Sequence, residues 1–108
     1  MIDPTAWVTA APDGDHVSIT ITGEIDLSNA EQVEEQITSS VPNHCTSASV
    51  DLTDVTYVDS VGMRIFFNLV ARLRTAQIEL KVIAPRSSPA RRIVDISGLN
   101  AVVTVEPV

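Results

Sequence analysis

Cysteine and histidine are scarce in this sequence, and their scarcity argues against several kinds of site. Cys45 is the only cysteine, so no internal disulfide can form, which is typical of proteins in a reducing cytoplasm. His16 and His44 are the only histidines, and both fall in or near predicted turns. Because no pair of histidines or cysteines has the spacing of metal ligands, a zinc site has little support. We expect no metal and no cofactor.

Long apolar stretches are also missing. Residues 1–4 contain no basic region followed by an apolar stretch, so the sequence predicts no signal peptide. The longest apolar runs are far shorter than the roughly 20 residues that a membrane-spanning helix needs. We therefore expect a cytoplasmic protein with no membrane partner.

Basic residues are half as numerous as acidic residues. Seven lysines and arginines stand against 14 aspartates and glutamates, which gives a formal net charge of −7. Such a chain lacks the positive field that attracts nucleic-acid phosphates or anionic lipids. We expect no direct nucleic-acid partner, although Arg86, Arg91 and Arg92 leave room for a local basic patch.

The motifs of common enzymes are absent as well. No glycine loop of the kinds that bind nucleotide phosphates is present. Ser60 lacks the flanking glycines of a nucleophile elbow, and no histidine is placed by a motif to join Ser60 and Asp59 in a triad. The sequence therefore predicts a protein that is not an enzyme.

The sequence does contain a regular succession of strand-like and helix-like segments, over a length suited to one domain, residues 1–108. Alternating apolar residues predict strands over residues 17–22, 47–52 and 78–82, with a loop over 53–56. Residues 5–11 and 101–105 can form a first and a last strand. Apolar residues at helical intervals predict helices over residues 28–39, 61–74 and 89–97. The first helix should begin with a capping box of Ser28 and Glu31, and Gly98 should end the last helix.

This order, β-β-α-β-α-β-α-β, predicts a single α/β domain with a mixed β-sheet. The first two strands should form a hairpin, and the later strands should be parallel, because helices alternate with them. Three strands show apolar residues on one face only, so the helices should lie mainly on one face of the sheet. Right-handed crossovers then require strands two to five to step in a single direction.

Residues 57–63 (YVDSVGM) are the main candidate for a functional site. Ser60 has a structural interpretation as the N-cap of the second helix, where its oxygen would accept a backbone N–H bond. The functional interpretation uses an exposed hydroxyl at the same place, with Gly62 leaving room for another chain to approach closely. A phosphate on Ser60 would meet the positive end of the helix and add about −1.5 to −2 charges. The two roles are compatible.

The segment 51–63 (DLTDVTYVDSVGM) resembles the signature of the anti-sigma factor antagonists, a family of single STAS domains. That signature has an aspartate, a phosphorylatable serine, a small residue and then glycine. Residues 23–26 (GEID) are similar to the Gly-Glu-hydrophobic-Asp of the family before its first helix. Pro85 with residues 92–99 (RIVDISGL) resembles the last helix of the family and the turn after it. The three motifs occur in the expected order over nearly the whole chain.

The resemblance implies a STAS-like fold and a function in partner switching. The unphosphorylated antagonist binds an anti-sigma factor, which is also a serine kinase, and so frees a sigma factor. The kinase then phosphorylates the serine of the antagonist, here Ser60, and the complex separates. A metal-dependent serine phosphatase restores binding.

The resemblance also implies that the partner-binding residues surround the serine. These residues are Asp26, Asp59, Ser60, Val61, Gly62, Met63 and Arg64. Asp26 matches an aspartate of the family but is equally typical of a turn. Asp59 either orients the serine or stabilises the turn, and Met63 either contacts the partner or packs in the core. Val61 stands where the family often has serine or threonine, and Met63 replaces a common leucine.

Two other hypotheses stay open. The chain could be a STAS scaffold that is never phosphorylated and assembles with other regulatory proteins. It could also be a small-ligand sensor, or a hydrolase that uses Ser60, although the lack of a histidine partner counts against hydrolysis.

Overall fold

The computed structural model describes residues 5–107, and these residues form one α/β domain in the predicted order. The elements are β1 (Ala6–Asp13), β2 (His16–Ile25), α1 (Ala30–Ser39), β3 (Ser47–Val58), α2 (Ser60–Thr75), β4 (Glu79–Ile83), α3 (Pro89–Ser97), the short 3₁₀ helix η1 (Leu99–Ala101) and β5 (Thr104–Glu106). Residues 1–4, on which the expectation about a signal peptide rests, lie outside the described residues.

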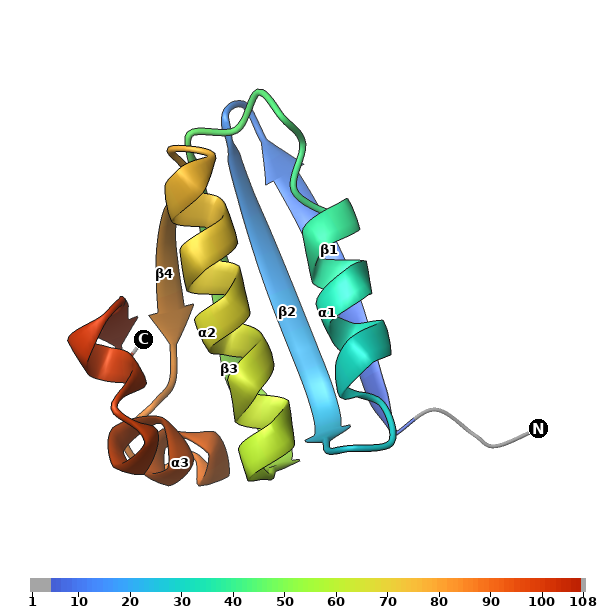
Figure 1. The fold of residues 1–108 in the computed structure, drawn as a ribbon, viewed down its shortest axis with the longest axis vertical. Helices are drawn as coiled ribbons and strands as arrows, with labels where there is room; N and C mark the ends of the chain where they lie inside the picture. Colours follow the sequence, from blue (N-terminus) through green and yellow to red (C-terminus); the bar gives the residue numbers. More distant parts are fainter. Residues whose placement is uncertain (1–4, 108) are drawn as a thin grey trace.

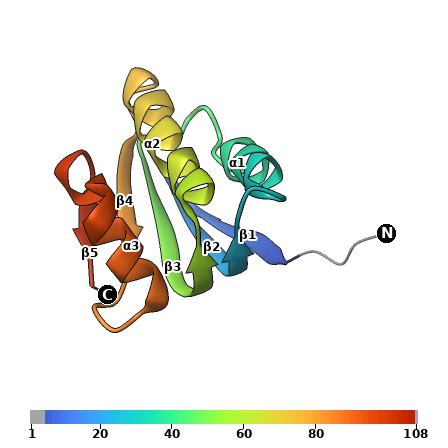
Figure 2. The ribbon, with the colours of Figure 1, turned by 60° about the horizontal axis from the view of Figure 1, so that its bottom comes forward.

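The five strands form one mixed sheet in the order β1-β2-β3-β4-β5. Figure 1 labels the first four strands, and Figure 2 shows β5 beside β4. Strands β1 and β2 are an antiparallel hairpin, and β2 to β5 are parallel to one another. The strands therefore step in a single direction across the sheet, as right-handed crossovers over one face require.

The hydrophobic core lies between the sheet and its helices. Figure 2 shows α1 and α2 on the same side of the sheet, and α3 packs against β3 beside α2. The residues that β2, β3 and β4 point toward the helices are buried, as alternation predicts: Val17, Ile19, Ile21, Ala48, Val50, Leu52, Leu80 and Val82. Intervening residues such as Ser18, Thr20 and Ser49 are polar. The placement of the helices mainly on one face is thus confirmed.

Strand β3 is longer than predicted, because residues 53–56 continue the strand instead of forming a loop. Thr53 and Asp54 are both exposed, which breaks the alternation that marks a strand in the sequence. Two register shifts in the pairing with β2 accommodate this irregularity and return Val55 and Val58 to the core. The long strand carries the chain directly to Asp59.

The start of α1 also differs from the prediction, because Asn29 is its N-cap and the capping box does not form. Ser28 instead donates its backbone N–H to the Asp26 carboxylate at 2.9 Å, and its hydroxyl also bonds that carboxylate. These bonds hold Ser28 in a turn before the helix, so the helix begins at Ala30.

The C-terminal helix follows the prediction more closely. Pro89 occupies the first turn of α3, and Gly98 ends the helix with a left-handed φ of 82°. The final strand begins later than predicted, at Thr104, because η1 includes Ala101, the first residue of the predicted segment, and a turn follows at residues 102 and 103. Of the helices within residues 5–107, none is both long and apolar enough to cross a membrane.

Candidate functional site

The candidate site forms where β2 and β3 end side by side. Ile25 pairs with Val58 in the last register position of these parallel strands, so the residues that follow, Asp26 and Asp59, leave the sheet at the same edge. The backbone N–H of Asp59 donates to the Ile25 carbonyl at 3.2 Å. Functional loops gather at this carboxyl edge of parallel sheets.

Asp59, rather than Ser60, is the N-cap of α2. Its backbone is extended, and its carboxylate accepts a hydrogen bond from the N–H of Gly62 at 2.7 Å. The second oxygen of the same carboxylate accepts from the N–H of Leu27, in the loop before α1, at 3.2 Å. The interpretation of Ser60 as the cap is therefore wrong, because the neighbouring aspartate already satisfies the helix N–H. Asp59 stabilises the turn and ties it to the β2–α1 loop.

Ser60 occupies the first position of α2, and its side chain is exposed. Within residues 5–107, its hydroxyl makes no hydrogen bond. The backbone on which it stands is fixed by the Asp59 cap on one side and by the helix on the other. A hydroxyl that is exposed, unbonded and rigidly placed is accessible to a modifying enzyme.

Gly62 is buried, which corrects the expectation that it leaves room for another chain. A Cβ at this position would lie 2.7 Å from the carbonyl oxygen of Ile25 and 2.9 Å from its Cγ2. The glycine thus permits the close approach of α2 to the end of β2 inside the domain, and not an approach from outside.

The remaining predicted residues of α2 divide between the core and the surface. Met63 is 3% exposed and packs in the core, Val61 is half-buried, and Arg64 is exposed. Ser60 and Arg64, four residues apart, share one side of the helix.

Asp26 is held by its own loop and is partly exposed. The hydroxyl of Ser28 and, next, its backbone N–H lower the pKa of the Asp26 carboxyl from the usual value of 3.8. The N–H of Asp26 donates to the side-chain oxygen of Asn29 at 2.9 Å, and the amide group of Asn29 donates to the Glu24 carbonyl at 2.8 Å. These bonds support the interpretation of Asp26 as a turn residue, and the Asp59–Leu27 bond places this turn beside Ser60.

An apolar groove of about 430 Å³ runs between α2 and α3 beside Ser60. Its walls are Ser60, Met63, Arg64 and Phe67 of α2 and Ile93, Ile96 and Ser97 of α3. Ile96 is 70% exposed, and Leu27 on the β2–α1 loop is 74% exposed. The α3 wall of the groove is not among the residues that the sequence predicts for the site. The signal was present in Ile96, an apolar residue outside the buried stripe of Ala90 and Val94.

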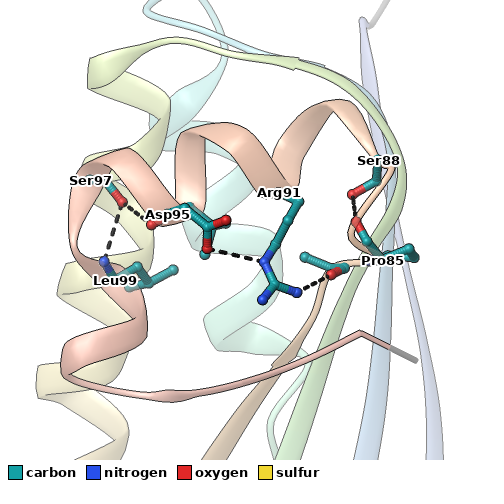
Figure 3. Close-up of polar contacts among 8 residues, drawn as sticks. Pro85, Ser88, Arg91, Asp95, Ser97 and Leu99 are labelled. Carbon is teal, nitrogen blue, oxygen red and sulfur yellow. Dashed lines mark hydrogen bonds and ion pairs between the residues drawn. The ribbon is translucent and has the colours of Figure 1, made fainter.

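The polar contacts of α3 engage Arg91, one of the three arginines of the suggested basic patch (Figure 3). Arg91 forms an ion pair with Asp95 at 3.1 Å and donates to the Ala84 carbonyl at 2.8 Å. These contacts fix Arg91 within its own helix region, so its guanidinium is not free, whereas Arg86 and Arg92 form no ion pair among the described residues.

The two histidines lie at the opposite end of the sheet from Ser60. His16 begins β2 and contacts the Ser47 hydroxyl at 2.6 Å, whereas Ser60 follows the far end of β3. His44 contacts the Gly14 carbonyl in the β1–β2 turn, at the same end as His16. No histidine can therefore activate Ser60. In the described part of the chain, no three acidic, histidine or cysteine side chains gather as a metal site.

Comparison with known proteins agrees with this fold. The STAS domain family model matches residues 8–108. The anti-sigma-B factor antagonist of Listeria monocytogenes is 33% identical over 96 residues, which are 89% of this chain and 83% of the relative.

Two solved structures share the fold. A crystal structure of an anti-sigma factor antagonist from Mycobacterium paratuberculosis matches with a TM-score of 0.83 at 22% identity, over 95% of this chain and 86% of the other. The Bacillus cell fate determinant SpoIIAA, solved in its phosphorylated form, matches with a TM-score of 0.65 at 19% identity, over 92% of this chain and 90% of the other. On the family match and the sequence identity, this chain belongs to the STAS domain family and, within it, to the anti-sigma factor antagonists.

Proposed function

We propose that this chain binds an anti-sigma factor through the surface around Ser60, that this binding releases a sigma factor, and that phosphorylation of Ser60 ends it. The partner is an anti-sigma factor with serine kinase activity, and a metal-dependent serine phosphatase reverses the modification. The protein acts in the cytoplasm as a binding module and not as an enzyme.

The observation that carries the proposal is the position of Ser60 on the rim of the groove between α2 and α3. Its side chain is exposed and lines the groove together with Ile96. Leu27, a second exposed apolar residue, lies on the loop that Asp59 ties to the start of α2. Exposed apolar patches of this kind mark interaction sites on soluble domains. A partner that covers this surface would bury Ser60, so a charged group on Ser60 would directly weaken the binding of that partner.

A phosphate at Ser60 changes the charge of this surface without requiring the domain to unfold. The modified side chain would carry about −1.5 to −2 charges at neutral pH. It would stand at the N-terminal end of α2, where the helix dipole favours a negative charge. Like charges brought together across an interface cost several kcal/mol, and each 1.4 kcal/mol is a tenfold change in affinity.

The test uses the purified chain, an anti-sigma factor kinase from the same organism, and ATP. Mass spectrometry should find one phosphate, on Ser60, and none on Ser60→Ala. Calorimetry should give similar affinities for the unmodified protein and Ser60→Ala, and at least a tenfold loss for the phosphorylated protein. Ser60→Asp should lose less affinity, because one carboxylate carries less charge and fewer oxygens than a phosphate. Equal affinities for the unmodified and phosphorylated proteins would refute the switch, and phosphate confined to another residue would move it.

A further inference from the structure

Arg64 is an unpaired cation on the rim of the groove that holds Ser60. Among the described residues that line the groove, it is the only charged one. Two other arginines are engaged: Arg91 contacts Asp95 and the Ala84 carbonyl, and Arg74 donates to the Val102 carbonyl at 2.9 Å. Arg72, Arg86 and Arg92 have no ion pair among residues 5–107, but none of them lines the groove. Arg64 makes no ion pair or hydrogen bond within the described part of the chain.

The spacing of Ser60 and Arg64 suits an ion pair once Ser60 carries charge. Residues four apart on a helix are neighbours, with Cβ atoms about 5–6 Å apart. The acidic member of such a pair is favoured on the N-terminal side, which is the position of Ser60. The planar guanidinium of arginine also matches the oxygens of a phosphate, which can accept two parallel N–H bonds.

We propose that Arg64 is the phosphate-binding residue of the modified protein: phosphoserine 60 and Arg64 form an ion pair along one side of α2. Asp59 cannot take this role, because it is itself acidic and its two oxygens already accept bonds from Gly62 and Leu27. The proposal rests on the proposed function in that it takes Ser60 to be the modified residue.

This ion pair gives the phosphate a second effect on the groove. Phosphorylation adds negative charge to the rim, and it also occupies the one cation that the rim offers to an acidic group of a partner. Arg64 would thus exchange a contact with the partner for a contact with the phosphate of its own chain.

The test is phosphorus NMR on the full chain with phosphoserine installed at position 60 during synthesis, so that no kinase is needed. The pKa of the second phosphate ionisation should be lower than in Arg64→Gln, by about 0.5 or more, because the guanidinium favours the doubly charged form. Arg64→Lys should restore part of this pKa shift, because lysine keeps the positive charge but cannot donate two parallel N–H bonds as the guanidinium does. High salt should reduce the difference, because both groups are exposed.

Arg72→Gln is the matched control. Arg72 is an exposed cation on the same helix. It follows Ser60 by 12 residues, so it lies about 18 Å further along the helix axis. Arg72→Gln should leave the pKa of the second phosphate ionisation unchanged. Identical titrations in the unsubstituted protein and in Arg64→Gln would overturn the inference, even if a kinase modifies Ser60 and the proposed function holds. A kinase that ignores Ser60 would instead overturn the proposed function and leave the NMR result standing.

Discussion

The carboxylate of Asp59 accepts a hydrogen bond from the backbone N–H of Leu27, 3.2 Å away and 32 residues earlier in the chain. Its other oxygen accepts from Gly62 in the first turn of α2. One side chain therefore joins the start of the helix that carries Ser60 to the loop that carries Asp26. The shape of the proposed partner surface depends on this bridge.

Replacing Asp59 should separate its two roles. Asp59→Ala loses the cap and the bridge, and should lower the free energy of unfolding by about 1–2 kcal/mol. Asp59→Asn keeps an oxygen for Gly62, and asparagine is as good an N-cap as aspartate, so it should keep the cap and cost less than Asp59→Ala. Its amide nitrogen cannot accept a bond from Leu27. Urea unfolding measures the stabilities, and hydrogen exchange at the Leu27 amide should quicken in both variants. Unchanged exchange in both would show that the bridge does not hold the loop.

Gly62→Ala should destabilise the domain, although the same change elsewhere in a helix usually stabilises it by about 0.4–1 kcal/mol. The new Cβ would meet the backbone oxygen of Ile25 at 2.7 Å, and a backbone atom cannot move aside like the end of a flexible side chain. Overpacking of this kind costs about 1–3 kcal/mol. Urea unfolding gives the value, with Arg72→Ala, an exposed change on the same helix, expected within about 0.5 kcal/mol. A stabilised Gly62→Ala would contradict the close contact.

The arrangement of the fold could be predicted from the sequence because it depends on patterns along the chain. Alternating residues such as Val50 and Leu52 mark the buried face of a strand, and the order of the segments leaves few topologies. The extension of β3 could not be predicted. It depends on register shifts in the pairing with β2, and the adjacent exposed residues Thr53 and Asp54 look like a loop when taken alone.

The motifs in the sequence predict where the candidate site lies, but they do not predict the structural role of each residue in it. Asp59 and Ser60 are adjacent and both are favoured N-caps, so only the backbone geometry shows which one caps the helix. The groove could not be predicted either. The groove depends on where α3 packs against α2. The spacing of Ile93 and Ile96 indicates an apolar helix face, but it does not show which element lies beside that face.

Ser60→Ala should leave the stability of the domain within about 0.5 kcal/mol of the unsubstituted protein. The hydroxyl is exposed and does not cap α2, and alanine is a better helix former than serine. Chemical denaturation of the two proteins under identical conditions is the measurement. A loss above about 1 kcal/mol would mean that the hydroxyl has a structural role, and effects of this variant on partner binding could then no longer be ascribed to the missing phosphate alone.

Ser28→Ala should raise the pKa of Asp26, because the hydroxyl of Ser28 is the largest influence that lowers it. The bond from the Ser28 backbone N–H remains in the variant, so the pKa should stay below its usual value. The carboxyl has a lower pKa in the folded chain than in the unfolded chain. The ionised carboxyl therefore stabilises the fold fully at a pH above its pKa in the unfolded chain. This stabilisation is lost as the pH falls through its pKa in the folded chain. The stability difference between the unsubstituted protein and Ser28→Ala should accordingly be larger at pH 7 than in strong acid.

An NMR titration of the Asp26 carboxyl measures the pKa shift, and Ser87→Ala, in an exposed loop, is the control. If Asp26 titrates alike in all three proteins, the hydroxyl of Ser28 does not hold the carboxylate in solution.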